Sequence, residues 1–105
     1  MTTTDLVLSK FKDAIYAAYG AEIERVVLFG SRARGDANPD SDYDIAVFLN
    51  GLTDRWKEVR RIADIEVAIL SETGAIIEAL PHPAGSWRDT NSPLMREIRK
   101  DGRDL

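Results

Sequence analysis

Cysteine is absent from the chain, and histidine occurs once. Without cysteine the protein has no disulfide bridge, no thiolate zinc site and no cysteine nucleophile. Its sequence contains no stretch of about 18 apolar residues, so it predicts no membrane-spanning helix. The first five residues, MTTTD, lack the basic segment and apolar core of a secretory signal. We therefore expect a cytoplasmic protein.

Positive charge is also scarce. Fourteen Lys and Arg stand against 18 Asp and Glu, which gives a formal net charge of −4. Nonspecific nucleic-acid binding needs a net basic surface, so we expect no direct binding of nucleic acid. The 105 residues suffice for a single domain, 1–105, with one core. If the protein is an enzyme, a second molecule must hold part of the substrate; the oligomeric state, a homo-oligomer included, stays open.

Hydrophobic periodicity predicts helices and strands that alternate along the chain. The order helix-strand-turn-strand-helix-strand-helix indicates an α/β or α+β fold with a small mixed sheet of about three to four strands. Helices are expected at 5–19, 54–72 and 94–101, strands at 25–29, 42–49 and 75–80, a single helical turn at 31–35 and a loop at 36–40.

Some conspicuous side chains are explained by packing or by loop structure. Trp56 falls in an apolar helical stripe with Leu70, so we expect both to face the core. Pro81 is expected to stop the third strand, and His82 to lie in the loop that follows.

The segment GSRARG, from Gly30 to Gly35, has the features of an anion site. It follows the buried strand VVLF and turns as if to begin a helix, where free N–H groups favour a phosphate. Gly30 permits close approach of the backbone. The hydroxyl of Ser31 adds a hydrogen bond, and Arg32 and Arg34 can bind phosphate through two donors each.

Asp42 and Asp44 form the second half of the motif. Alternate residues of a strand share a face, so these two carboxylates project together while Tyr43 points to the other side. Their repulsion is relieved by a cation between them. Oxygen ligands beside a phosphate site suit Mg²⁺ or Mn²⁺.

Gly30-Ser31, ten further residues and then Asp42-x-Asp44 resemble the signature of the nucleotidyltransferase superfamily that includes DNA polymerase β. The strings GSRARG and SDYD are similar to the minimal nucleotidyltransferases, prokaryotic proteins of about this length. The resemblance implies that Gly30 and Ser31 hold the triphosphate of ATP and that Asp42 and Asp44 hold two divalent ions. It also implies transfer of a nucleoside monophosphate, usually AMP, to a hydroxyl with release of pyrophosphate.

A third carboxylate is expected on the next strand, where the family resemblance implies an acid that activates the acceptor hydroxyl. Glu78 is the only acid of the predicted strand 75–80, but the residues two positions away, Ile76 and Leu80, resemble core residues. Asp64 and Glu66 are alternatives if 65–70 forms a strand instead of the end of a helix. The sequence leaves this choice open, along with loss of the third acid.

The resemblance also implies a partner. Minimal nucleotidyltransferases are commonly paired with a small helical HEPN-domain protein, and the pair resembles a toxin–antitoxin module with the nucleotidyltransferase as antitoxin. We therefore expect AMP transfer from ATP to a hydroxyl of a HEPN toxin. One alternative is an antitoxin that has lost the third carboxylate and neutralises its partner by binding alone. Another is modification of a small molecule in a pocket completed by a dimer or a further domain.

Overall fold

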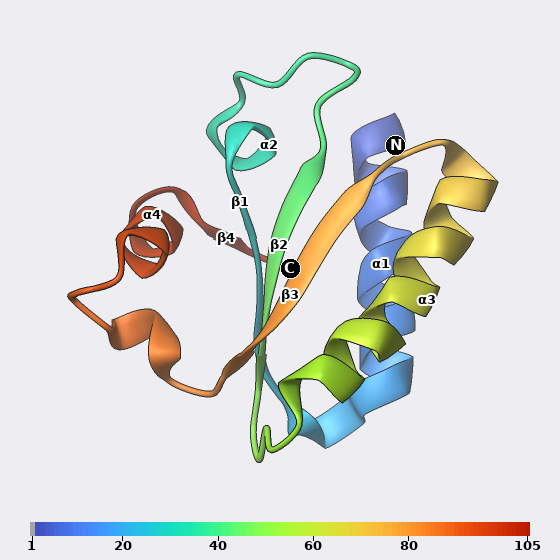
Figure 1. Cartoon of the computed structure of the whole chain (residues 1–105). Helices are drawn as coiled ribbons and strands as arrows, with labels where there is room; N and C mark the ends of the chain where they lie inside the picture. The colour runs from blue at the N-terminus through green and yellow to red at the C-terminus, as the bar shows by residue number, and fades with distance from the viewer. Residues whose placement is uncertain (1) are drawn as a thin grey trace.

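The computed structural model describes residues 2–105, and it shows a four-stranded sheet between two unequal helical layers (Figure 1). The spatial order of the strands is β3-β2-β1-β4, with β2 antiparallel to β1 and parallel to β3. This arrangement confirms the predicted mixed α/β fold. The strands are β1 (Ile23–Phe29), β2 (Tyr43–Leu49), β3 (Ile77–Pro83) and β4 (Arg103–Asp104). The helices are α1 (Thr3–Tyr19), α2 (Ser31–Arg34), α3 (Arg55–Thr73) and α4 (Pro93–Asp101), with short 3-10 turns η1 (Gly20–Glu22) and η2 (Ser86–Arg88).

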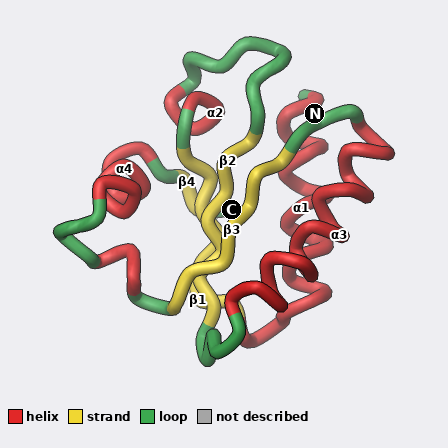
Figure 2. Tube along the Cα trace, viewed as in Figure 1, coloured by secondary structure: helices red, strands yellow, loops and turns green. Residues whose placement is uncertain are grey.

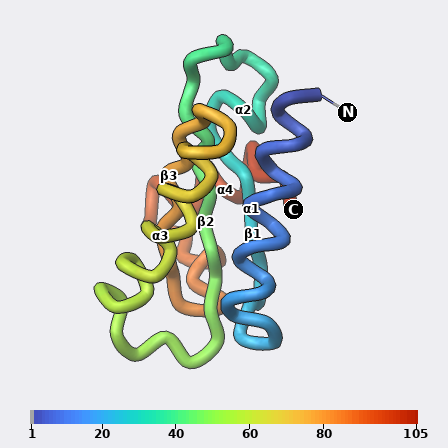
Figure 3. Tube along the Cα trace, turned by 90° about the vertical axis from the view of Figure 1, so that its right-hand side faces the viewer, coloured from blue at the N-terminus to red at the C-terminus, as the bar shows by residue number. Residues whose placement is uncertain are grey.

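The two long helices, α1 and α3, cover one face of the sheet and form the larger core with it (Figures 1 and 3). Within residues 2–105, no helix is long and apolar enough to cross a membrane. The fully buried side chains of this layer alternate along β1 and β2, as a half-buried strand requires. The fully buried residues of the layer include Leu28 and Ile45 of these strands, Phe11 and Ile15 of α1, and Ile62 of α3.

The opposite face is covered only in part, by α4 and η2. Phe48 and Ala46 of β2 pack there with Met95 and Ile98 of α4. The first residues of β2 and β3 lie outside this smaller cluster. Leu80 of β3 is 45% exposed on this face. The beginnings of two adjacent strands are therefore open to solvent.

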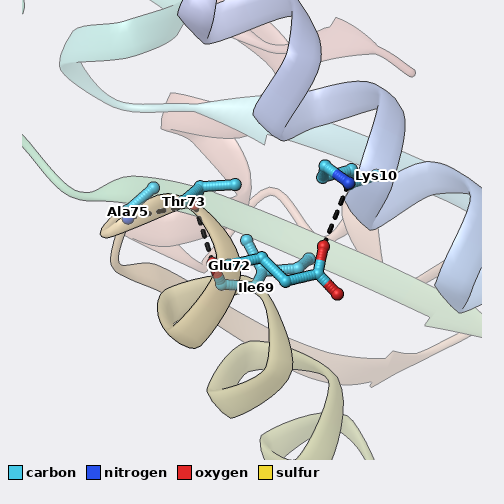
Figure 4. A network of polar contacts seen from close by, with 5 residues as sticks. All are labelled: Lys10, Ile69, Glu72, Thr73 and Ala75. Carbon is cyan, nitrogen blue, oxygen red and sulfur yellow. Dashed lines mark hydrogen bonds and ion pairs between the residues drawn. The ribbon is translucent and has the colours of Figure 1, made fainter.

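The α1–α3 layer is held by polar contacts as well as by apolar packing (Figure 4). Lys10 donates to Glu72 at 3.0 Å across the two helices. At the end of α3, the Thr73 hydroxyl donates to the carbonyl of Ile69 and accepts from the N–H of Ala75. These bonds satisfy backbone groups that the helix end would otherwise leave unpaired, and they lead the chain into β3.

The predicted strand end at Pro81 is wrong, because β3 continues to Pro83 as an edge strand. Residues 77, 79, 81 and 83 direct their backbone groups away from β2, since Ile76 and Ala84 bond on the β2 side. A proline that faces outward removes no ladder hydrogen bond. The outward N–H of Ala79 donates to Glu66 at 3.1 Å, and Arg55 donates to the outward carbonyl of Pro81 at 3.2 Å. The edge is thus closed to a further strand.

The predicted core position of Trp56 is also wrong. Its side chain is 68% exposed, and that of Leu70 is 46% exposed. Ile62 and Ile69 of α3 are buried against the sheet, and Ile65 packs beside them. The apolar residues of this helix therefore belong to two faces, which the sequence pattern merged into one.

His82 lies in β3 and not in a loop, partly buried with its ring 5.6 Å from the ring of Phe48. Burial, with a smaller contribution from the charge of Arg55, lowers the pKa of His82. A lowered pKa in the folded state means that this group's contribution to stability is complete above its ordinary pKa of about 6.5. That contribution is lost as the pH falls through the lowered value.

We therefore expect the free energy of unfolding of the wild type to decline more between pH 7 and pH 5 than that of His82→Gln. Urea unfolding at several pH values measures this difference, and the acids common to both proteins cancel from it. Since His82 is the only histidine, parallel pH profiles would contradict the prediction.

Candidate active site

The Gly30-Ser31 turn and Asp44 are brought together by the pairing of β1 with β2. Phe29, the last residue of β1, is the register partner of Asp44 near the start of β2. The turn that leads from β1 into α2 therefore lies beside the start of β2 (Figure 2). The first carboxylate of β2 is that of Asp44, next to Gly30. Two halves of the sequence motif that are more than ten residues apart thus form a single site.

Gly30 is required at this turn for two reasons. Its φ of 73° and ψ of −158° place it in a region of backbone conformation that is open almost only to glycine. A Cβ built on Gly30 would lie 2.3 Å from Oδ2 of Asp44. The missing side chain therefore provides the space in which the Asp44 carboxylate sits.

Glu78 is the acid that the sheet places next to Asp44. The two residues are register partners in the parallel pair β2–β3, and they project from the same open face. Asp42 directly precedes β2, while Tyr43 is 2% exposed and packs toward α1 and α3 as predicted. Three acids thus gather at the uncovered beginnings of two strands: Asp42, Asp44 and Glu78.

The raised pKa values of Asp44 and Glu78 are consistent with a site that binds a positive charge. Burial, and then the charge of Asp42, raise the pKa of Asp44, although the hydrogen bond with Glu78 and, to a smaller extent, the charge of Arg34 oppose this effect. The pKa of Glu78 is raised by its loss of solvent and by the charges of Asp42 and Asp44. Mutual repulsion therefore makes these acids easier to protonate or to neutralise with a cation.

The two predicted phosphate-binding arginines differ in what they contact. Arg32 donates to the carbonyl of Ser41 at 2.8 Å and to that of Pro39 at 3.2 Å. It also stacks on the ring of Tyr43 at 4.3 Å. Its guanidinium thereby holds the loop that leads to the acids, so a role in positioning Asp42 accounts for these contacts. A phosphate contact by Arg32 stays a prediction.

Arg34 lies on the open side of the site. Its Nε donates to Asp36 at 3.1 Å, and its Nη1 is 3.6 Å from Glu97 of α4. The hydrogen bond with Asp36 raises the pKa of Arg34. Glu97 was not among the predicted site residues; it raises the pKa of Asp44 by its charge. Only the packing of α4 beside α2 brings Glu97 here, and no sequence motif signals it.

The alternative third acids lie on other surfaces. Residues 65–70 are helical, within α3, and α3 covers the opposite face of the sheet from Asp44. Glu66 is engaged with the N–H of Ala79 at the edge of β3, and burial raises its pKa. Asp64 is exposed on α3. Of the three candidates, the structure places only Glu78 beside Asp42 and Asp44.

Comparison with known proteins identifies the family. A family model described as "Nucleotidyltransferase domain" matches residues 8–92. The chain belongs to this family. A protein of Methanocaldococcus jannaschii named "Putative protein adenylyltransferase MJ0604" is 27% identical over 99 residues, which cover 93% of each chain.

Solved structures share the fold of this nucleotidyltransferase domain. One, described as a toxin–antitoxin with AMP-PNP, has a TM-score of 0.60 and 18% identity, over 90% of this chain and 68% of that chain. Another contains a tri-AMPylated Shewanella oneidensis HEPN toxin in complex with an MNT antitoxin. Its TM-score is 0.53 with 16% identity, over 93% of this chain and 70% of that chain.

The acids of the nucleotidyltransferase domain have the donor chemistry of a Mg²⁺ or Mn²⁺ site. Across residues 2–105, no group of three or more His, Cys, Asp or Glu side chains is arranged to hold a metal ion. Mg²⁺ usually takes one or two protein carboxylates and completes its shell with water and substrate phosphates. Asp42 and Asp44, whose repulsion a cation would relieve, fit that requirement.

Proposed function

We propose that this nucleotidyltransferase domain transfers AMP from ATP to a hydroxyl of a partner protein, and that the partner is a HEPN toxin. The observation on which the proposal rests is the position of Asp42, Asp44 and Glu78 beside the Gly30-Ser31 turn on an uncovered part of the sheet. A phosphate-binding turn next to clustered carboxylates suits attack at a phosphoryl group.

The chain's residues divide between the two ends of the reaction. The turn at Gly30 and Ser31 binds the triphosphate through backbone N–H groups and the serine hydroxyl. The exposed guanidinium of Arg34, close to this turn, can turn toward a phosphate oxygen. Asp42 and Asp44 would hold Mg²⁺ or Mn²⁺, which supplies charge neutralisation at the triphosphate. This leaves Glu78, on the edge strand, to face the acceptor.

The acceptor oxygen forms a bond to the α-phosphorus as the bond from that phosphorus to the bridging oxygen breaks, and pyrophosphate leaves. The proton of the hydroxyl moves to Glu78 or to water. Glu78 suits this role by position, because it is the register partner of Asp44 on the open face of the sheet.

The relatives support a protein as the acceptor. The similar protein of M. jannaschii is named as an adenylyltransferase acting on protein, and one similar structure contains an AMPylated HEPN toxin.

The test is incubation of the purified chain with ATP, Mg²⁺ and a small helical HEPN-domain protein from the same organism. We expect a mass increase of one or more AMP groups on that protein. Tight binding without added mass would instead support an antitoxin that acts by binding alone. If the chain neither binds nor modifies the HEPN proteins tested, the proposed partner is rejected.

Glu78→Gln tests the role of the third acid. We expect AMP transfer to fall by about 10²–10⁴-fold, the usual contribution of a general base, while ATP binding persists. Glu66→Gln is the matched control, because it removes a carboxylate from the other face of β3 and is expected to retain transfer. Equal rates in both variants would show that Glu78 is not the acceptor-side acid.

A further inference from the structure

The outer face of α3 has an apolar stripe that nothing in residues 2–105 covers. The exposed fractions of its side chains are 68% for Trp56, 64% for Val67 and 46% for Leu70. Val59 and Ala63 lie between them along the helix and are partly exposed. Large exposed apolar side chains on one helix face are typical of a binding surface. Figure 3 shows α3 with its outer face toward solvent, beside α1.

The spacing of the stripe reads the same in both directions. The intervals between Trp56, Val59, Ala63, Val67 and Leu70 are 3, 4, 4 and 3 residues. An antiparallel copy of α3 that crosses at Ala63 would place Trp56 opposite Leu70 and Val59 opposite Val67. Such a surface is self-complementary about a two-fold axis. The small side chain of Ala63 at the crossing point allows the two helices to approach to about 8–10 Å.

The charges beside the stripe follow the same symmetry. Arg60 and Asp64 are exposed on one side of it, and no ion pair to either is found among the described residues. In the antiparallel arrangement, Arg60 lies about 3 Å along the helix axis from Asp64 of the other copy, at 1.5 Å of rise per residue. Two such pairs form, one on each side of the axis; the two Asp64 residues lie about 3 Å apart along the axis at the centre, each flanked by an Arg60.

The edge of β3 offers no competing mode of association. Its outward N–H at Ala79 and carbonyl at Pro81 are already bonded to Glu66 and Arg55. Prolines occupy two of its outward positions, 81 and 83. Pairing of strands between two copies along this edge is therefore blocked, and the stripe of α3 beside it can make contact only through side chains.

We propose that the protein forms a symmetric homodimer through antiparallel packing of α3 against α3 of a second copy. The clustered acids lie on the other face of the sheet, toward α4, so both active sites stay open in the dimer. One helix from each copy gives a small interface, and we expect a dissociation constant of about micromolar order.

Sedimentation equilibrium of the full chain, at about 100 µM and therefore well above such a constant, tests the dimer. We expect the mass of two copies for the wild type and of one copy for Val67→Glu. Leu6→Glu is the control: Leu6 is 45% exposed on α1, away from the stripe, and this variant is expected to remain dimeric. A monomeric wild type would overturn the proposal, even if the stripe then binds another protein.

A charge exchange distinguishes this geometry from nonspecific association. Arg60→Asp and Asp64→Arg should each weaken the dimer, by about threefold to tenfold for a partly exposed pair. The double variant restores the opposite charges and should recover most of the wild-type affinity. If the double variant is weaker than either single variant, the antiparallel register centred on Ala63 is wrong.

Discussion

Asp44→Asn should abolish AMP transfer, with a loss of at least about 10³-fold, and leave the protein folded. The loss follows because Asn removes the negative charge that would hold a divalent cation beside the triphosphate. The fold should survive because an amide fits the same space next to Gly30. Transfer to the proposed HEPN partner is measured by mass spectrometry, and folding is measured by thermal unfolding of the same samples.

The stability of this variant should equal or exceed that of the wild type. Burial and the charge of Asp42 raise the pKa of Asp44, so its ionised form opposes folding. A raised pKa in the folded state means that this penalty is absent below the ordinary value of about 3.8 and grows as the pH rises through the raised value. At neutral pH we expect Tm to rise by up to a few °C. In a domain of this size, a change of 1 kcal/mol in stability shifts Tm by about 4–8 °C.

Asp13→Asn is the control, since Asp13 is exposed on α1, far from the acids. It should keep full transfer and an unchanged Tm. Mg²⁺ with ATP should raise the Tm of the wild type and of this control, but not that of Asp44→Asn, because a ligand stabilises only the protein that binds it. Full transfer by Asp44→Asn would contradict the assignment of this carboxylate.

The sequence motif predicts which residues form the site better than it predicts the strand pairing that brings them together. The spacing of Gly30, Asp42 and Asp44 is local, and strand periodicity alone puts the two aspartates on one face. Glu78 depends on a parallel pairing between β2 and β3, across the whole of α3, which no local pattern specifies. The apolar neighbours of Glu78, among them Leu80, suggest a buried face. However, β3 is an edge strand, and the face that carries Glu78 and Leu80 is not covered by a helix.

The wrong predictions have the same physical origin. Periodicity shows that a helix has an apolar stripe but not whether the stripe meets a core, so the pattern alone wrongly places Trp56 inside. Proline stops a strand only where its missing N–H faces a neighbour, and Pro81 faces outward. In each case the outcome depends on which elements lie next to the segment. The tertiary arrangement sets those neighbours, and the local sequence does not reveal them.

Gly30→Ala should eliminate transfer as completely as Asp44→Asn does, but at a cost in stability. The new Cβ would be 2.3 Å from Asp44 Oδ2, so the carboxylate must leave its position. The backbone at φ 73° and ψ −158° is also strained for alanine, at about 1–3 kcal/mol. We therefore expect a lower Tm together with the loss of transfer, measured by thermal unfolding and by AMP incorporation.

Gly35→Ala separates the two causes. Gly35 has a φ of 83°, so alanine is strained there too, but a Cβ at that position meets nothing within 4 Å. This variant should lose only the stability due to backbone strain, about 1–2 kcal/mol, and keep most of its transfer activity. Adding Asp44→Ala to Gly30→Ala should recover part of the lost stability, since the clash then has no second partner. If Gly30→Ala keeps full transfer, or if the double variant is merely additive, Gly30 does not make the space for Asp44.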